Sequence, residues 1–250
     1  MRRSVVPETI DLLLKELKLP AFIRHYQRHQ EQALVEGHGH VRYLSGLCEL
    51  EAADRYQKRV QKWTREAGLP VGKSLANLNL GEFDTAIQQQ ILALKDHPEW
   101  AQRAGNVLLI GPSGVGKSHI AAAIAHQLIE QNVRVKWCTA VALVQNLQQA
   151  KRDLDLMTVM TRLDKYQVLV IDDIGYVKKN DAETQVLFEF IAHRYESGSL
   201  IITSNQTFSQ WDQIFPDNMM TVAAIDRIVH HATIIEIEGE SYRKKHSLKN

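Results

Sequence analysis

The chain has 250 residues, of which 24% are charged and 44% hydrophobic, a balance that fits a globular protein and excludes a disordered or fibrous one. Its 30 Lys and Arg residues against 29 Asp and Glu residues give a net charge of +1, so any affinity for nucleic acid has to come from local patches. No apolar run is long enough to cross a membrane, and acidic residues soon after the basic start argue against a secretory leader, so we expect a cytoplasmic protein.

The first 67 residues are expected to form a small all-helical domain. After Pro7, apolar residues recur at helical spacing until Pro20 closes the first helix. A second helix is expected over residues 21–36 and a third, longer one over residues 41–67, because glycines interrupt the pattern between them. Residues 68–82 are rich in Gly, Pro and Asn, which is typical of a linker.

The histidines of the helical region form no complete metal-binding pattern, and the two cysteines stand alone. His25 and His29 stand one helical turn apart, but neither a cysteine nor a paired carboxylate completes a ligand set, so we interpret them as surface or capping residues. Cys48 and Cys138 are isolated and far apart in the sequence, so we expect reduced, partly buried thiols.

The helix over residues 41–67 carries a row of positive charges on one face, which we call the basic stripe: Arg55, Lys58, Arg59, Lys62 and Arg65. Such a row can neutralise backbone phosphates, so the basic stripe is a candidate contact surface for duplex DNA. Acidic residues precede the bases, an order that the helix dipole also favours on a solvated face. The residues alone leave both interpretations open.

The strongest pattern in the chain is a phosphate-binding loop. Residues 111–118 read G-P-S-G-V-G-K-S and match the P-loop pattern G-x-x-x-x-G-K-[ST] at every fixed position. The glycines let backbone N–H groups approach a polyphosphate, Lys117 adds a positive charge, and the Ser118 hydroxyl is an oxygen ligand for Mg²⁺. We assign these residues to nucleotide contacts: Gly111, Pro112, Ser113, Gly114, Val115, Gly116, Lys117, Ser118 and His119.

Strands and helices alternate around the P-loop. A helix over residues 83–95 leads to an apolar strand over residues 107–110, and a helix over residues 118–131 follows the loop. The patterns then predict, in order, a strand over 133–138, helices over 141–152 and 157–163, a strand over 167–171, a helix over 182–197 and strands over 199–203 and 233–237. This alternation predicts a doubly wound α/β fold with a parallel sheet.

Polar residues that follow two of these strands are candidates for catalysis. The apolar strand V-L-V-I-D-D ends like a Walker B element, so Asp172 is expected to hold Mg²⁺ and Asp173 to act on the attacking water. Asn205 follows the next strand, and because parallel strands end at one edge, it is placed to hydrogen-bond the γ-phosphate or the water. Arg227 is a candidate arginine finger, although pairing with a neighbouring aspartate would explain it as well.

Several motifs occur together in this chain: the P-loop, V-L-V-I-D-D-I-G, F-E-F-I-A-H-R-Y-E, I-I-T-S-N, D-R-I-V-H-H, G-E-S-Y-R and, in the helical region, Y-L-S-G-L-C-E-L-E-A-A-D-R. The set resembles the IstB family, the ATP-binding helper proteins of insertion sequences, which is a branch of the AAA+ ATPases close to the DnaC-like helicase loaders. The resemblance implies a homo-oligomer with ATP sites at subunit boundaries, which assembles on duplex DNA, hydrolyses ATP with Mg²⁺ and controls a partner transposase during transposition. By position it implies Asn205 as sensor 1, Arg227 as the arginine finger and Arg243 as a sensor-2-like residue.

The expected organisation is a helical adaptor or DNA-binding domain over residues 1–67, a linker over 68–82 and an AAA+ ATPase domain over 83–250. Two features depart from the general AAA+ pattern. Asp173 stands where a longer Glu is usual, so its distance to the water and the turnover rate are open questions, and the chain ends at Asn250 without room for a full helical lid.

Three other functions fit parts of these patterns. A DnaC-like loader of a replicative helicase has a motor with the same motifs, and partner binding would separate it from a transposase regulator. A P-loop kinase of a small metabolite would turn over ATP only with its acceptor. A DNA-binding scaffold that binds ATP without useful hydrolysis is suggested by Asp173.

Overall fold

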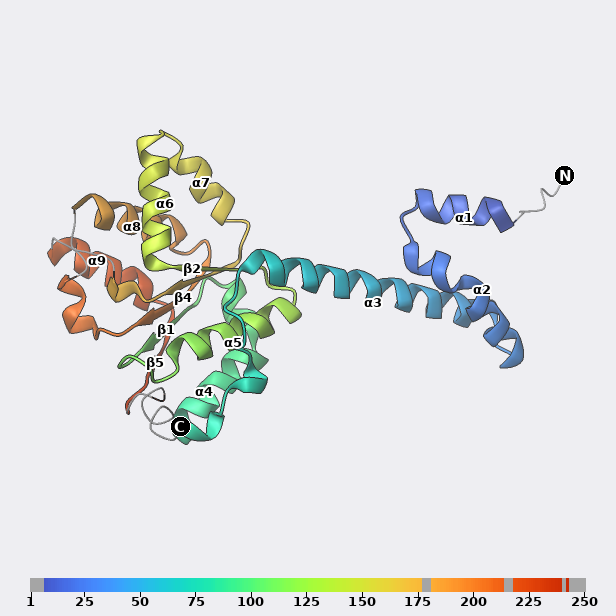
Figure 1. Cartoon of the computed structure of the whole chain (residues 1–250), viewed down its shortest axis with the longest axis horizontal. Coiled ribbons are helices and arrows are strands. Elements are labelled where there is room, and N and C mark those ends of the chain that lie inside the picture. Colours follow the sequence, from blue (N-terminus) through green and yellow to red (C-terminus); the bar gives the residue numbers. More distant parts are fainter. Residues whose placement is uncertain (1–6, 177–180, 214–217, 240–241, 243–250) are drawn as a thin grey trace. The chain divides into compact units, whose positions relative to one another are not determined.

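The computed structural model describes residues 7–176, 181–213, 218–239 and 242. The chain divides into two compact units, Met1–Lys62 and Trp63–Asn250. Helix α3, His40–Ala67, contributes residues to both units (Figure 1).

The first unit contains helices α1 (Pro7–Glu16), α2 (Pro20–Val35) and the N-terminal part of α3. Among the side chains described in this unit, few apolar ones are buried: Leu14, Ala21, Ala33 and Leu47. Because this apolar core is small, hydrogen bonds and ion pairs between α2 and α3 are expected to contribute to the stability of the unit.

Glu51 of α3 is the first of these links. Its buried carboxylate accepts hydrogen bonds from the backbone N–H of Ala21 and from Nε of Arg55, both at 2.8 Å. Burial alone would raise the pKa of the Glu51 carboxyl, but the hydrogen bonds from Arg55 and Ala21 outweigh it and hold that pKa below its ordinary value.

Asp54, one turn further along α3, is the second link. It pairs with Arg24 of α2 and with Lys58 of its own helix, with 2.7 Å between Lys58 Nζ and Asp54 Oδ2. Hydrogen bonds from Lys58 and Arg24 lower the pKa of the Asp54 carboxyl. Arg55 and Lys58, two members of the basic stripe, are therefore both paired with carboxylates of α3.

Within its described residues, the second unit is built on a five-stranded parallel sheet with the strand order β2-β3-β4-β1-β5. The strands are β1 (Asn106–Ile110), β2 (Val135–Thr139), β3 (Val168–Asp172), β4 (Ser199–Ser204) and β5 (Ala232–Glu236). Strands β1, β3 and β4 are buried along their whole length, as expected for parallel strands covered on both faces.

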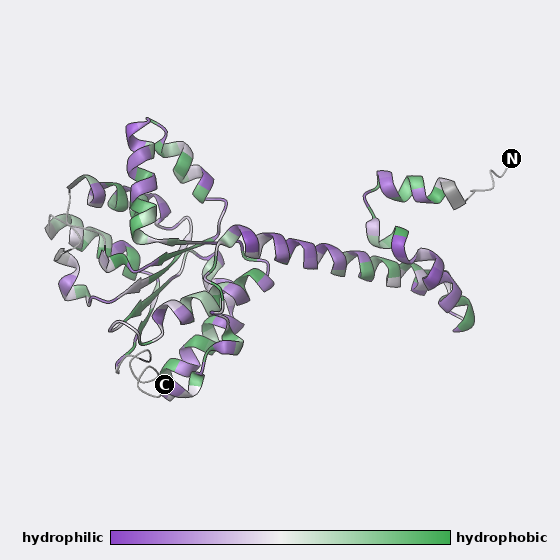
Figure 2. Ribbon diagram, in the orientation of Figure 1, coloured by the Kyte–Doolittle hydropathy of each residue, from purple (hydrophilic) through white to green (hydrophobic). Residues whose placement is uncertain are grey.

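Helices cover both faces of this sheet, which confirms the predicted doubly wound α/β fold. They are α4 (Thr85–Asp96), α5 (Lys117–Glu130), α6 (Ala140–Arg152), α7 (Leu156–Leu163), α8 (Asp181–Arg194) and α9 (Asn218–Val229). Helix α5 packs on one face with α4 behind it, whereas α6, α8 and α9 share a core with the other face (Figure 1). Figure 2 shows that apolar residues gather on the strands of the sheet.

Helix α8 is shorter than the sequence pattern predicts. The expected helix over 182–197 is wrong at its end, because the chain leaves the helix after Arg194 and Glu196 adopts a left-handed conformation with φ 58°. The guanidinium of Arg194 is buried, and a Cβ atom on Gly198 would lie 2.2 Å from it. A tight turn at residues 195–198 thus encloses the Arg194 side chain.

Residues 68–82, expected as a linker, contain two short 3-10 turns, Leu75–Asn77 and Leu80–Glu82. This segment touches the beginning of α5, because the carbonyl oxygen of Ser74 lies 3.0 Å from Nε2 of His119. In the second unit it is thus part of the wall around the P-loop.

Both cysteine thiols are free. Cys138 in β2 is partly buried as expected, and burial raises the pKa of its thiol to about 12. The expectation of partial burial is wrong for Cys48, which is exposed on α3. Among the described residues, no helix combines the length and apolar character needed to cross a membrane.

Candidate nucleotide-binding site

The P-loop begins where the ends of two neighbouring strands meet. Gly111 follows β1 with φ 155°, and a Cβ atom on it would lie 2.2 Å from the carbonyl oxygen of Ile237. The backbone N–H of Ile237 donates to the carbonyl of Ile110 at 2.8 Å, which continues the pairing of β5 with β1. Glycine is therefore required at position 111 for both conformation and space.

Helix α5 begins at Lys117, directly after the loop. Gly116 precedes it in a left-handed conformation with φ 102°, and the ring of Phe83 lies 3.2 Å from where a Cβ atom of Gly116 would be. The positive end of the helix dipole thus faces the loop, which favours an anion there. Lys117 is 5% exposed, and its ammonium donates to the carbonyls of Gly111 at 2.7 Å and Pro112 at 2.8 Å.

Strand β3 ends in a carboxylate that is held by the neighbouring strand β4. Asp172 is 9% exposed, and its Oδ1 accepts a hydrogen bond of 2.7 Å from the hydroxyl of Thr203 in β4. The same Thr203 oxygen accepts the backbone N–H of Asp173 at 2.8 Å. Asp173 has φ 59°, an uncommon conformation for a residue with a side chain, so the hydroxyl of Thr203 fixes both acidic residues.

The order of the strands places these groups near the P-loop. Because β4 lies between β1 and β3, Asp172 stands two strands from the loop, and at about 4.8 Å per strand this separation is roughly 10 Å. Asp172 and the P-loop lie at the edge of the sheet where the parallel strands end, which is the usual place for ligands in such folds.

Asn205 follows β4 at the same edge. Its amide oxygen is buried and, among the residues that the structure describes, has no hydrogen-bond partner. A Cβ atom on Gly175, in the turn after Asp173, would lie 2.3 Å from that oxygen. Gly175 therefore leaves the space that Asn205 occupies.

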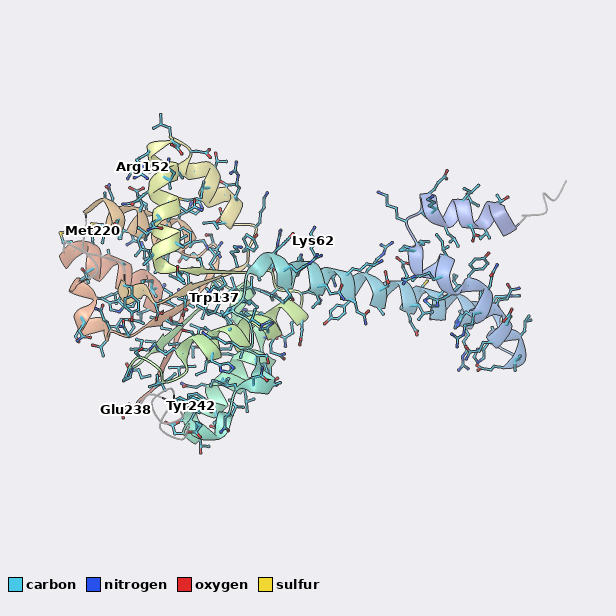
Figure 3. All side chains as sticks on the ribbon, in the orientation of Figure 1. Lys62, Trp137, Arg152, Met220, Glu238 and Tyr242 are labelled. Carbon is cyan, nitrogen blue, oxygen red and sulfur yellow. The ribbon has the colours of Figure 1, made fainter. Side chains whose placement is uncertain are left out.

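A cavity of about 290 Å³ adjoins the P-loop. Among the described residues, three parts of the chain line it: residues 73–83, part of 114–119 that includes Ser118 and His119, and residues 237–239 with Tyr242. Phe83 and Tyr242 supply aromatic rings, and Figure 3 shows Glu238 and Tyr242 on the same side of the unit. Sequence reasoning did not identify the wall formed by residues 73–83, because its composition reads as a loop.

Arg227 does not lie beside the P-loop of its own chain. It stands near the end of α9, where its Nη1 donates to the carbonyl of Ala223 at 2.9 Å and its guanidinium lies 5.4 Å from the ring centroid of Phe188. Strand β5 begins soon after α9 and runs parallel to β1 toward the P-loop. Its five residues, at about 3.3 Å each, span roughly 16 Å, so Arg227 lies near the opposite edge of the sheet from the P-loop. Arg243, the expected sensor-2-like residue, lies outside the described residues.

All five members of the basic stripe are exposed on α3, including Lys62, which Figure 3 labels. Arg55 and Lys58 have the carboxylate partners described above, and Arg59 lies 5.9 Å from the ring centroid of Tyr56. The stripe is therefore a mixed surface, on which part of the positive charge is balanced by α3 itself.

Known proteins resemble the chain over almost its whole length. The sequence model of the family described as IstB-like ATP binding protein matches residues 12–250. An insertion sequence ATP-binding protein of Sinorhizobium fredii (strain NBRC 101917 / NGR234) is 43% identical over 249 residues, which are 98% of this chain and 84% of the relative. The IS21 insertion sequence ATP-binding protein of Pseudomonas aeruginosa is 31% identical over 96% of this chain and 90% of its own length.

A solved structure supports the fold. The DnaC helicase loader matches 65% of this chain and 97% of its own with a TM-score of 0.53 and 18% identity. This likeness supports the predicted doubly wound α/β fold. With the family model and both relatives covering nearly all of the chain, the protein belongs to the family of IstB-like ATP binding proteins.

Proposed function

We propose that this protein binds ATP with Mg²⁺ at its P-loop and hydrolyses it within an assembly of several copies on duplex DNA, through which it controls a partner transposase. The observation that carries the proposal is the P-loop beside the Asp172–Thr203 pair and Asn205 at one edge of the sheet. The names of the relatives from Sinorhizobium fredii and Pseudomonas aeruginosa support ATP and the insertion-sequence context.

The phosphates are assigned to the P-loop. Its N–H groups and the N-terminus of α5 would hold the phosphate oxygens, and Lys117 would exchange its contacts with the loop carbonyls for the β- and γ-phosphates. The nucleoside is assigned to the adjoining cavity, whose volume of about 290 Å³ is near the lower end of the range for small-molecule sites. Phe83 and Tyr242 would flank the base there.

The oxygen atoms at this edge suit Mg²⁺. The ion prefers hard oxygen ligands, and the Ser118 hydroxyl and the Asp172 carboxylate supply them. Thr203 occupies Oδ1 of Asp172, so we assign Oδ2 to the metal site. Bound Mg²⁺ would neutralise charge on the phosphate oxygens.

The remaining polar groups would act on the attacking water. Asp173 is the candidate that accepts its proton, and Asn205 would orient the water or the γ-phosphate through its amide. The contact of the Asp173 N–H with Thr203 supports the backbone from which this shorter side chain extends.

Hydrolysis would require a neighbouring copy. The charge that develops on the γ-phosphate is well compensated only when a guanidinium is present, and Arg227 lies too far from the P-loop of its own chain to supply it. We assign Arg227 to the ATP site of an adjacent subunit. Duplex DNA, with the basic stripe as a candidate contact, would favour the assembled form.

ATPase measurements with the full-length protein test this function. ATP hydrolysis should depend on Mg²⁺, rise when duplex DNA is added, and disappear in Lys117→Ala, which should keep the fold by circular dichroism. Turnover that needs a small-molecule acceptor instead would indicate a kinase, and binding without hydrolysis under all conditions would indicate a scaffold. Co-purification with the transposase of a neighbouring gene supports the regulator, whereas a replicative helicase as partner would indicate a loader.

A further inference from the structure

Two turns bring together a carboxylate and two imidazoles at the edge of the sheet where the parallel strands begin, opposite the edge that carries the P-loop. Glu196 lies in the turn before β4, and His230 and His231 lie in the turn before β5. One ligand atom from each of the three side chains lies within 4.8 Å of the others, and all three residues are exposed. No second group of three such side chains occurs among the residues that the structure describes.

A buried side chain ties these two turns to each other. Asn106, which is 8% exposed, donates through Nδ2 to the carbonyl of Ile228 at 2.8 Å, and its Oδ1 accepts the N–H of Leu200 at 2.9 Å. Its backbone N–H donates to the carbonyl of His231 at 2.9 Å. The turn that carries the histidines and the turn that carries Glu196 are thus connected through one residue of β1.

The buried side chain of Arg194 holds the turn that carries Glu196. That guanidinium is 2% exposed and donates to the carbonyls of Tyr166, Gln167 and Ser199 at 3.1 to 3.3 Å. In the same turn, Glu196 has a left-handed backbone conformation, and a Cβ atom on Gly198 would lie 2.2 Å from the Arg194 guanidinium. The carboxylate of Glu196 is therefore exposed, whereas the backbone of its turn is held by Arg194.

The imidazole of His230 also has a fixed orientation. Its Nδ1 lies 2.8 Å from the hydroxyl of Tyr195, and its ring centroid lies 4.1 Å from that of His231. When Nδ1 carries the proton and donates it to Tyr195, the lone pair of Nε2 is available to a metal ion. This arrangement of an outer hydrogen bond is the usual support of a metal-binding histidine.

We propose that Glu196, His230 and His231 form a binding site for a divalent cation of the zinc class. Two imidazole nitrogens and one carboxylate oxygen suit Zn²⁺ and related ions, whereas Mg²⁺ prefers oxygen ligands alone. Ligands at about 2.0 to 2.2 Å from a tetrahedral zinc ion are roughly 3.4 Å apart, so small rotations of the exposed side chains would complete the site, with water as the fourth ligand. The ion would hold the C-terminal end of α9 to the turn before β4.

The histidines of the first unit provide a matched control. His29 stacks on Tyr43 with ring centroids 5.7 Å apart, and its Nε2 lies 2.2 Å from where a Cβ atom of Gly46 would be. One ring face and Nε2 of His29 are thus taken up by packing within that unit. His25, one turn earlier on α2, can be replaced by alanine as a variant that removes an imidazole elsewhere.

Titration of the metal-free full-length protein with Zn²⁺, without nucleotide, tests the site by calorimetry. We expect one zinc ion per chain, with at least about 10-fold weaker binding in His231→Ala and in Glu196→Gln and no change in His25→Ala. Tyr195→Phe, which removes the hydroxyl that contacts both His230 and Glu196, should weaken zinc binding by about 10-fold to 100-fold. Circular dichroism should show that all variants keep the fold.

Thermal unfolding gives an independent readout. A saturating concentration of Zn²⁺ should raise the midpoint of the wild-type protein and of His25→Ala, but not that of His231→Ala. Unchanged zinc affinity in both His231→Ala and Glu196→Gln would overturn the proposal, as would several weak ions per chain that His25→Ala and His231→Ala reduce equally.

Discussion

The hydroxyl of Thr203 in β4 donates to Oδ1 of Asp172 at 2.7 Å, which joins the end of β3 to its neighbour. The same oxygen accepts the backbone N–H of Asp173, so a single uncharged side chain determines where both acidic residues stand. This contact leads to the first prediction.

Thr203→Val should separate the two acidic residues from their support while keeping the shape of the side chain. Without the hydroxyl, the buried Asp172 carboxylate loses a hydrogen bond, which we expect to lower the free energy of unfolding by about 1 to 3 kcal/mol and to weaken Mg²⁺-dependent ATP binding. Thr203→Ser is the matched control and should keep both properties. Denaturant unfolding measures the stability, and nucleotide titration measures the ATP affinity. If Thr203→Val matches Thr203→Ser in both, the hydroxyl has no role and Thr203 contributes only by packing.

Asp173→Asn should bind ATP with Mg²⁺ normally and fail to hydrolyse it. The amide cannot accept a proton, while asparagine tolerates the left-handed conformation observed at this position. Single-turnover hydrolysis is the measurement, with nucleotide affinity determined on the same sample. If hydrolysis in the variant proceeds at the wild-type rate, Asp173 is not the base.

Gly175→Ala should impair hydrolysis by displacing Asn205. A Cβ atom at position 175 would lie 2.3 Å from Oδ1 of Asn205, so the amide has to move, whereas the P-loop is not touched. We expect turnover to fall toward that of Asn205→Ala, with ATP affinity little changed. Gly39→Ala is the control, because nothing lies within 4 Å of the added atom. Normal turnover in Gly175→Ala would show that the position of Asn205 has no effect on catalysis.

The free energy of unfolding of the first unit should fall at acidic pH, because Glu51 and Asp54 then become protonated. The pKa values of both carboxyls are lowered in the folded protein, so their contribution is present above the unfolded values of about 4 and is lost as the pH falls through the folded values. The double variant Glu51→Gln, Asp54→Asn should therefore unfold at a lower temperature than the wild type at pH 7, and this difference should shrink toward pH 3. A difference that is constant over this range would contradict the assignment.

Much of the nucleotide site could be predicted from the sequence, because its groups are adjacent in the chain or stand at strand ends. The P-loop pattern specifies a strand, a loop and a helix within a few residues, and the aspartates and Asn205 each follow an apolar strand. The parallel sheet then brings these strand ends to one edge.

Other parts of the site depend on contacts between distant segments, which local patterns do not encode. Phe83 lies next to Gly116, and residues 73–83 line the cavity only because the segment folds back on α5. Thr203 is one of three polar residues at the end of β4, and only the pairing of β3 with β4 distinguishes it as the partner of Asp172. The spacing of Arg55 and Lys58 from the preceding acidic residues does predict their ion pairs, which reduce the charge that the basic stripe offers to DNA.

In the proposed assembly, Arg227 completes the ATP site of an adjacent copy. Arg227→Ala should bind ATP but lack the guanidinium, whose contribution to the rate is on the order of 10³ to 10⁵, while Lys117→Ala should keep the guanidinium but lack a working site. Each variant alone should therefore be inactive on duplex DNA.

The most direct measurement is ATP hydrolysis by mixtures of these two inactive variants over a range of ratios, with their co-assembly verified by sedimentation. We expect partial recovery of activity with a maximum at intermediate ratios, because some Arg227→Ala subunits would receive Arg227 from a Lys117→Ala neighbour. The absence of recovery at every ratio, in assemblies shown to contain both variants, would contradict it.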